Sequence, residues 1–482
     1  MSRMSKPGIV VAAASALVAL AGCGDRLTVP NFQNPTTSSI LSDPLAAIPL
    51  LATGVLRDDR AQMTGYVSGV GILGRESYNY TPTEGRNTSG FLTSDVKNST
   101  SFGGTALWTG PWFTIRDAFN TLQLIDAASS ALVSDQQKSA MRGLLHTETA
   151  LSLLYLLNTR DSLGIPVEVY EDPTKLAPFV SRDSAFNYIV ALLDQANTEL
   201  GKGGTAFPFT LHAGFNALTA SGVPATVPTY AKFNRALAAR VNAYRASRGV
   251  AGCGAALSPA CYQTVLTDLQ ASFIDANGSL TLGAYNVYSA AANDAANTIS
   301  NAATTAIVAH PKADSGVMKR ADGTPDLRFS SKVIKLSAPK SGPTSIQAVP
   351  TNWDYSIYAD RSSPIPIIRN EELILLRAEA EYFTGDKTGA LNDINLIRTK
   401  SGGLAARGAF TSDADFIDEL LYNRRLSLLF EGHRWIDMRR FNRLNQLTID
   451  VPSHIVVSHL PVTQNECLSR ANADASLKGP GC

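Results

Sequence analysis

The sequence predicts a mainly helical protein, in which helix pairs are separated by long irregular loops and there is little β structure. Apolar residues recur at three- and four-residue spacing in several segments, which is the period of one buried helix face. Runs with the apolar–polar alternation of a half-buried strand are few. The stretches between the periodic segments are long and rich in Gly, Pro, Thr and Ser, as in residues 201–228 and 322–366.

The first 45 residues have the pattern of a leader and a tether. A basic start at residues 1–6 precedes an apolar run over residues 9–20, which is shorter than the ~20 residues of a membrane-spanning helix. Small residues and then Cys23 follow, and this order resembles a bacterial lipobox, which implies cleavage before Cys23 and its lipidation. An ordinary signal peptide with a chance cysteine is the alternative. We predict a lipoprotein signal peptide over residues 1–22 and a lipidated, extended tether over residues 23–45.

After the tether, the three- and four-residue spacing of apolar residues predicts the positions of the helices. Pro111 suits a first helical turn, and the breaker pair at Gly164 and Pro166 ends the second helix. Residues 378–391 resemble a tetratricopeptide helical pair with its turn at Gly385. The expected helices cover residues 111–125, 136–157, 181–200, 229–248, 259–271, 370–383, 388–400 and 413–440.

No motif in the sequence indicates catalysis or a cofactor. Gly69, Gly71 and Gly74 match the GxGxxG pattern, which is weak alone, and no convincing strand precedes it, so we expect a flexible loop there. GxSxG, HExxH and Walker sequences are absent, and the six histidines are scattered. We therefore expect no catalytic residues, no metal site and no cofactor.

Composition excludes a strong electrostatic partner. The chain of 482 residues carries 42 Lys and Arg against 41 Asp and Glu, a net charge of +1, so it has no global field to attract nucleic acid. After the leader, no apolar run of 18 residues occurs, and a second membrane span is not expected.

The four cysteines after Cys23 form two local groups, Cys253 with Cys261 and Cys467 with Cys482. An exported chain meets an oxidising compartment, which favours two short-range disulfides. Free thiols are the alternative, and four cysteines allow three pairings, so the sequence does not fix the connectivity.

Two C-terminal motifs are the most specific after the lipobox. One runs over Ile365–Ala380 and is continued by Asn395–Arg398, and the other is Arg424–Arg440, with the core Phe-Glu-Gly-His-Arg-Trp-Ile-Asp. Together they closely resemble the SusD/RagB family of outer-membrane nutrient-uptake lipoproteins. Weaker matches lie at Leu154–Pro166, Phe233–Arg240 and Leu460–Glu466.

The resemblance implies a fold, a function and a location. It implies one SusD-like domain over residues 46–482, with a helical-repeat part at about 46–275 and a C-terminal motif part at about 310–482. It implies a binding protein rather than an enzyme, which captures oligosaccharides or peptides and delivers them to a SusC-like TonB-dependent barrel. The chain would be anchored by lipid alone to the outer membrane, facing the exterior, with no nucleic acid as partner.

The charged residues of the motifs allow two interpretations. They could be catalytic carboxylates with orienting arginines. Alternatively, because they alternate with apolar residues at helical spacing, they form bidentate pairs that fix how helices seat on one another. We favour this structural role for Arg369, Glu372, Arg377, Glu379, Arg398, Glu431, Arg434 and Asp437.

Aromatic residues on polar loops are the candidate ligand contacts, because sugar rings stack their apolar faces on aromatic side chains. Trp353, Tyr355 and Tyr358 lie in the stretch expected to be irregular, and Tyr78 and Tyr80 form a second cluster. Such rings can instead anchor their loops to the body of the protein or contact the barrel.

Two other functions compete with nutrient capture. A surface lipoprotein enzyme such as a glycosidase needs two carboxylates across a cleft. A helical-repeat scaffold would bind only other proteins.

Overall fold

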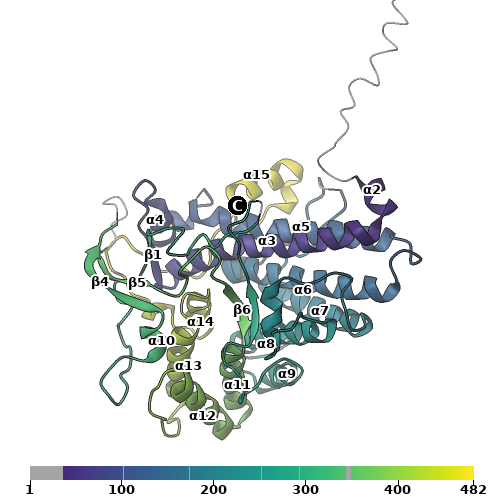
Figure 1. Cartoon of the computed structure of the whole chain (residues 1–482). Coiled ribbons are helices and arrows are strands. Elements are labelled where there is room, and N and C mark those ends of the chain that lie inside the picture. The colour runs from purple at the N-terminus through teal and green to yellow at the C-terminus, as the bar shows by residue number, and fades with distance from the viewer. Residues whose placement is uncertain (1–35, 101, 173, 251, 293, 343–348) are drawn as a thin grey trace, which may run out of the picture.

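The structure is a computed structural model that describes residues 36–482 except 101, 173, 251, 293 and 343–348 (Figure 1). It is mainly helical, as predicted, with rows of long helices and a few short strands. The predicted signal peptide, the lipidation site Cys23 and the first part of the tether lie outside the described residues. Among the described residues, no helix has the length and apolar character needed to cross a membrane.

Helical structure begins earlier than expected. Helix α2 covers Thr37–Ser42 and α3 covers Pro44–Leu73, so the predicted extended tether is wrong over residues 37–45. The Thr36 hydroxyl caps α2 by accepting a hydrogen bond from the Ser39 N–H at 3.2 Å. Proline is favoured in a first helical turn, where Pro44 begins α3.

The GxGxxG segment is the last part of α3, and the predicted flexible loop is wrong. A Cβ at Gly69 would lie 2.9 Å from Leu107 of α5 (Phe102–Ala127), and a Cβ at Gly71 would lie 3.1 Å from the Phe430 ring. The glycines therefore allow close packing of the helix on its neighbours.

Helix α5 also starts before its expected first residue, and Pro111 lies in its interior. Proline has no N–H, so the Leu107 carbonyl one turn earlier loses its helical partner. Arg160, at the end of α6 (Asp135–Arg160), donates a long hydrogen bond of 3.5 Å to that carbonyl. The Arg160 side chain, which comes from another helix, thus replaces the hydrogen bond that Pro111 removes from α5. The sequence around Pro111 does not show this contact.

The next helices are confirmed within a few residues. They are α6, α7 (Arg182–Lys202), α8 (Val227–Arg248) and α9 (Pro259–Gln270), followed later by α11 (Asn370–Thr384) and α12 (Lys387–Leu396). Consecutive helices pack against each other, α6 on α7 and α11 on α12 among them. Gly385 makes the predicted turn between α11 and α12, with φ of 103°.

The C-terminal motif forms two helices instead of the single one expected over residues 413–440. Helix α13 ends at Ser427, α14 covers Arg434–Arg440, and the intervening turn has φ of 56° at Phe430 and 89° at Gly432. Helix α12 also ends before residue 400 and passes into a π-helical turn over Ile397–Ser401.

Three two-stranded antiparallel sheets complete the fold. They pair β1 (Ser77–Asn79) with β3 (Ile307–Ala309), β2 (Gly283–Asn286) with β6 (Ile365–Arg369), and β4 (Val333–Lys340) with β5 (Thr351–Tyr355). The expectation of an irregular stretch over residues 322–366 is therefore wrong where β4 and β5 form. The short helices α4 (Arg86–Leu92) and α10 (Leu327–Ser330) lie between these strands in the chain, and α15 (Gln464–Ala473) follows α14.

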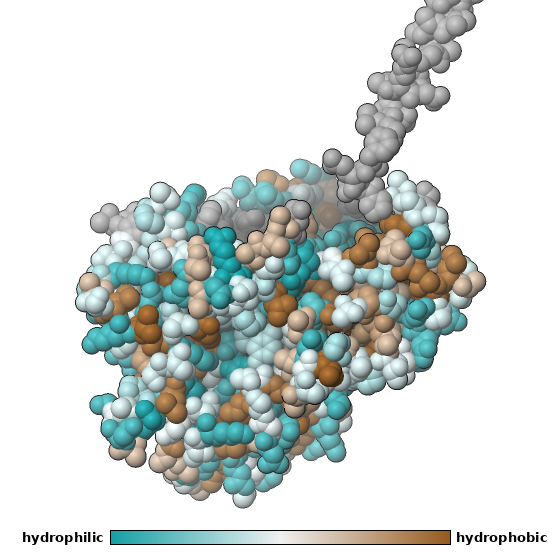
Figure 2. All heavy atoms as spheres, in the orientation of Figure 1, coloured by the Kyte–Doolittle hydropathy of each residue, from teal (hydrophilic) through white to brown (hydrophobic). Residues whose placement is uncertain are grey.

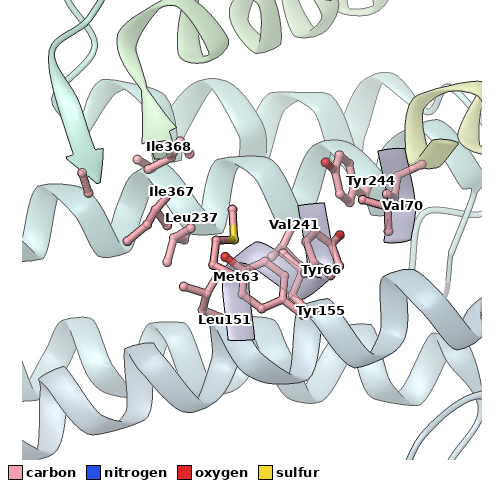
Figure 3. Packing of buried hydrophobic residues seen from close by; sticks show 14 of the residues in the cluster. Met63, Tyr66, Val70, Leu151, Tyr155, Leu237, Val241, Tyr244, Ile367 and Ile368 are labelled. Carbon is pink, nitrogen blue, oxygen red and sulfur yellow. The ribbon is translucent and has the colours of Figure 1, made fainter. Parts of the chain in front are cut away.

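The core is shared by the two halves of the chain. Figure 3 shows Met63 and Tyr66 of α3 packed with Tyr155 of α6, and residues of α8 and β6 close by. The Tyr66 and Tyr155 rings lie 4.5 Å apart. N-terminal helices and the C-terminal strand β6 therefore belong to one hydrophobic cluster.

Cysteine pairing is local in both groups. Cys253 forms a disulfide with Cys261, and Cys467 with Cys482. The second disulfide ties the last residue of the chain to α15, where an unrestrained terminus would fray.

Candidate functional site

The charged motif residues lie inside the protein, where they join helices. Arg240 of α8 and Glu372 of α11 form a bidentate pair, with N–O distances of 2.8 and 2.6 Å. Burial alone would raise the pKa of Glu372, but Arg240 outweighs it and lowers that pKa to about 2. Glu372 is therefore ionised in the folded protein, and both of its carboxylate oxygens accept hydrogen bonds from Arg240.

A second buried network ties α11, α13 and α14 together. Arg440 donates to both oxygens of Glu379, at 2.5 and 2.7 Å, and its Nε donates to Asp437 at 2.8 Å. Arg424 of α13 donates to the other oxygen of Asp437, also at 2.8 Å. Burial would raise the pKa of Asp437, but the two arginines lower it to about 2.

Most of the remaining motif residues also form an ion pair with another element, and Arg369 binds its sequence neighbour Glu371 as well. Arg369 binds Glu431 and Glu371, Arg377 binds Asp393 at 2.7 Å, and Arg398 binds Glu419 at 2.6 Å. Arg434 differs, because it forms no ion pair with any described carboxylate. The geometry supports the interpretation of these motifs as helix-joining pairs.

A cleft of about 610 Å³ lies between α3 and α5 and is closed at one side by β1 and the segment before β3. We call it the α3–α5 cleft. Its lining residues are Arg57, Asp58, Ala61, Gln62, Thr64, Gly65, Ser68, Asn79, Gly110, Phe113, Thr298, Ile299, Thr304 and Ile307. Residues three and four apart on α3 recur in the lining, so one face of that helix forms its floor.

The floor of the α3–α5 cleft is held in place by hydrogen bonds. The Gln62 amide donates to Asp59 and Thr114 at 3.2 Å, and the Thr298 hydroxyl donates to Thr64 at 2.9 Å. Gly110 of α5 lies against Gln62, where a Cβ would approach the Gln62 Cβ to 3.0 Å. The polar groups of the floor are thereby fixed before any ligand arrives.

An exposed aromatic ring stands at the mouth of the α3–α5 cleft. Phe113 of α5 is 63% exposed, although large apolar side chains are mostly buried in this protein. On the opposite side, Arg57 of α3 forms an ion pair with Asp58 at 3.1 Å. The cleft thus combines an apolar ring face with charged and hydroxyl-bearing side chains.

A second cleft, of about 590 Å³, lies between α10 and β6. Its charged lining includes Arg369, Glu371 and Glu431, which already bind one another. Their donors and acceptors are therefore occupied, and the α3–α5 cleft is the better candidate. Among the described residues, no group of three His, Cys, Asp or Glu side chains is arranged to hold a metal ion.

Comparison with known proteins relates the C-terminal part of the chain to a known family. Residues 343–475, which contain both C-terminal motifs, match the family model described as the SusD family. The C-terminal part of the chain thus matches the SusD family, and the fold of the chain is similar to that of solved SusD superfamily structures. No curated protein sequence matches it.

Solved structures of SusD-type proteins share the fold over most of the chain. A SusD superfamily protein from Parabacteroides distasonis is 14% identical, with a TM-score of 0.65 over 91% of this chain and 98% of that one. Bacteroides fragilis NanU is 14% identical, with a TM-score of 0.60 over 92% and 99%. A structure described as a SusD-like carbohydrate binding protein, also from B. fragilis, is 13% identical, with a TM-score of 0.59 over 84% and 87%.

Four of the five candidate aromatic residues are buried. Tyr78 donates a hydrogen bond to Asp450, and Tyr80 donates to the Val349 carbonyl at 2.5 Å. Tyr355 stacks on Phe430 with ring centroids 4.4 Å apart, and Tyr358 donates to the Phe430 carbonyl at 2.9 Å. These rings anchor their segments to the core and are not available to a ligand in this conformation.

Trp353 is the exception, because its ring is only partly buried. Phe329 approaches the ring edge-on at 5.4 Å, and the Lys335 ammonium lies 6.0 Å from its centre. Trp353 lies on β5 and does not line the α3–α5 cleft. Ligand contact at Trp353 therefore stays a prediction, separate from this cleft.

Two features of the sequence indicate residues that line the α3–α5 cleft. Alternation in β1 turns Tyr78 and Tyr80 inward, and Asn79 between them lines the cleft. Phe113 falls outside the apolar stripe of its helix, which a buried ring would not do. The α3 residues of the floor gave no such signal, because their segment was not recognised as a helix.

Proposed function

We propose that this protein is a SusD-family surface lipoprotein that binds an oligosaccharide in the α3–α5 cleft and delivers it to a SusC-like TonB-dependent barrel. The observation that carries the proposal is the exposed Phe113 ring beside the fixed polar floor. The similar B. fragilis structure described as a carbohydrate binding protein supports it.

The chemistry of the cleft suits a sugar. A sugar ring has apolar C–H faces, which stack on an aromatic ring, and hydroxyl groups, which bond to polar side chains. Phe113 offers the stacking face, while Asn79, Arg57 and Asp58 offer donors and acceptors around it. The volume lies within the usual range for ligand clefts, roughly 300–1,000 Å³.

Lipid anchoring completes the proposal. Cys23 follows a sequence that resembles a lipobox, and no described helix can cross a membrane. The lipid would hold the protein at the outer membrane, facing the exterior beside its barrel. Nucleic acid is not an expected partner of a chain with a net charge of +1.

Binding without hydrolysis is favoured by the carboxyl groups at the cleft. Asp58 lines the cleft, and burial together with a direct interaction with this carboxyl raises the pKa of Asp117 to about 6. Glycosidases hold their two carboxyl groups about 5 to 9.5 Å apart so that a sugar bond or a water fits between them. These two carboxyls are too close for that arrangement.

Calorimetry of the full chain with a panel of glycans and peptides tests the ligand class. We expect saturable binding of at least one oligosaccharide and roughly tenfold weaker binding by Phe113→Ala, since a lost stacking contact of about 1–1.5 kcal/mol corresponds to that factor. Phe113→Tyr should retain the affinity, and Leu468→Ala, which removes an exposed side chain on α15, is the matched control.

Three results would overturn the proposal. Binding of peptides alone, or equal glycan affinity in Phe113→Ala and wild type, would remove the carbohydrate site. Hydrolysis of a panel glycan that is lost in Asp58→Asn or Asp117→Asn would identify an enzyme. Pull-down from solubilised outer membrane should recover a large barrel protein, whereas soluble partners alone would indicate a scaffold.

A further inference from the structure

We infer that a basic pocket beside β1 and β3 binds a small oxyanion. The pocket has a volume of about 120 Å³ and is lined by Gly74, Arg75, His310, Lys312, Ser315, Arg425, Arg434, Gln446, Leu447 and Thr448. We call it the basic pocket. It lies beyond the Ser77–Ala309 end of the β1–β3 pair, whereas Asn79 and Ile307 at the other end line the α3–α5 cleft.

Four cationic side chains converge on the basic pocket. Arg75 donates only to backbone carbonyls, those of Ile72, Leu73, Thr448 and Ile455. Arg425 likewise donates to the carbonyls of Ser315 and Ala313, at 2.7 and 2.8 Å. These bonds hold two guanidinium groups in place without neutralising them, because none of the acceptors is charged.

Arg434 has even fewer partners. No hydrogen bond or ion pair joins its side chain to the described part of the chain, although the residue is half-buried. Burial and the neighbouring Arg425 lower the pKa of Arg434 to about 10, so it remains charged at neutral pH. A partly buried charge without a partner is costly, and protein charges in such places are normally paired.

The nearby acids do not balance these cations. Asp450 is already shared by Tyr78, His310 and Lys312. The His310 Nδ1 accepts the Lys312 N–H, so its Nε2 carries the proton donated to Asp450, and burial lowers the pKa of His310. That ring is therefore neutral.

Asp437, Glu76 and Asp314 also act on these arginines, and Asp437 is already bound by Arg424 and Arg440. Burial raises the pKa of Glu76 to about 7, so it is only partly ionised at neutral pH. Asp314 acts on Arg425 from a distance and forms no ion pair with it within 4.0 Å. Arg75, Arg425, Arg434 and Lys312 thus leave an excess of positive charge in a chain whose net charge is +1.

The geometry favours an oxyanion over other ligands. Guanidinium groups bind carboxylate, phosphate and sulfate oxygens through paired N–H donors. The Thr448 hydroxyl in the lining is buried and has no hydrogen-bond partner among the described residues. Since roughly 10–15 Å³ of such space holds one water, the pocket has room for several waters or one small oxyanion. Inorganic anions and the carboxylate of a larger acid share this chemistry, and the test below distinguishes them.

Calorimetry on the full chain in a non-ionic detergent tests the inference. Inorganic phosphate, sulfate and glucuronate are titrated separately at constant ionic strength, because added salt screens such contacts. We expect saturable binding of at least one anion, at least tenfold weaker in Arg434→Gln and partly restored in Arg434→Lys. Tighter binding of phosphate or sulfate indicates a free inorganic anion, and tighter binding of glucuronate indicates the acid group of a sugar.

Controls separate this site from the α3–α5 cleft. Arg86→Gln removes an arginine that is 64% exposed and should leave the anion affinity unchanged, as should Phe113→Ala. Arg434→Gln removes an unpaired charge, so it should fold as well as wild type, with the same circular dichroism. No saturable binding of any of the three anions, or equal affinity in Arg434→Gln and wild type, would overturn the inference without affecting the carbohydrate proposal.

Discussion

At the scale of single residues, the stability of this protein depends most strongly on the pairing of its buried charges. Arg240 and Glu372 are both almost fully removed from water, and each satisfies the other through two hydrogen bonds. In such surroundings the pair itself adds little net stability, but either partner alone is strongly unfavourable. These residues therefore specify how α8 seats on α11.

Glu372→Gln should lower the free energy of unfolding by about 3–5 kcal/mol, because it leaves the buried Arg240 charge without its carboxylate. Urea denaturation measures the change. Glu84→Gln breaks the exposed pair with Arg86 and should lower the free energy of unfolding far less, because water screens that pair. Equal losses in the two variants would contradict the helix-joining role of the motif.

Glu148 of α6 shows the opposite charge state. Burial and the nearby Asp59 raise the pKa of Glu148 to about 8, while the Tyr230 hydroxyl donates to it at 2.5 Å. The folded protein thus retains a proton that the unfolded chain releases near its ordinary pKa of 4.5. This contribution to stability is present below pH 4.5 and is lost as the pH rises to about 8.

Glu148→Gln should therefore be more stable than wild type at pH 8, with a difference that shrinks toward pH 5. The amide oxygen can still accept the Tyr230 hydroxyl, so the hydrogen bond is kept. Thermal unfolding at a series of pH values measures the difference. Burial also raises the pKa of Asp59, to about 6, and its own contribution is common to both proteins. A difference independent of pH would contradict a protonated Glu148.

At the scale of elements, the helical period predicted most helices but not their interruptions. Residues 413–440 keep an apolar period across the turn, so periodicity alone gives one helix. The break follows from Phe430, whose positive φ lets its ring stack on Tyr355. At Pro111 the sequence predicts that a helix begins, but the helix already runs through this residue. The packing of α5 on α3 and α6 stabilises the helix on both sides of the proline.

Gly432→Ala should be more destabilising than Gly385→Ala, and the comparison isolates packing. Both glycines have positive φ, which costs an alanine about 1–2 kcal/mol. A Cβ at Gly432 would also lie 2.9 Å from the Tyr66 ring, whereas a Cβ at Gly385 meets nothing within 4 Å. Urea denaturation should show an additional loss of about 1–3 kcal/mol at Gly432. Similar losses of stability at both sites would contradict the packing argument, because they would show that the Tyr66 ring moves aside at little cost.

At the scale of the whole molecule, the sequence predicted the fold class and the family but only the neighbourhood of the cleft. The tyrosines on either side of Asn79 were chosen because loop aromatics bind sugars, yet they pack into the core. Whether a ring faces solvent depends on elements distant in sequence, such as the Asp450 segment that binds Tyr78. Figure 2 shows polar and apolar residues intermixed on one face, so composition alone does not mark a site.

The proposed lipid anchor is tested at the scale of the whole molecule. Cys23→Ala should leave ligand affinity unchanged, because the α3–α5 cleft is formed by residues from Arg57 onward. It should abolish labelling by a fatty-acid precursor and move the protein from the membrane to the soluble fraction. Unchanged labelling or membrane retention in Cys23→Ala would contradict the lipobox interpretation.

The most direct test of the proposed function is a structure of the chain with the tightest-binding oligosaccharide of the panel. We expect a sugar ring stacked on Phe113, with its hydroxyl groups bonded to side chains of the α3–α5 cleft such as Asn79. A sugar bound at Trp353, or in the cleft between α10 and β6 with the α3–α5 cleft empty, would contradict the account.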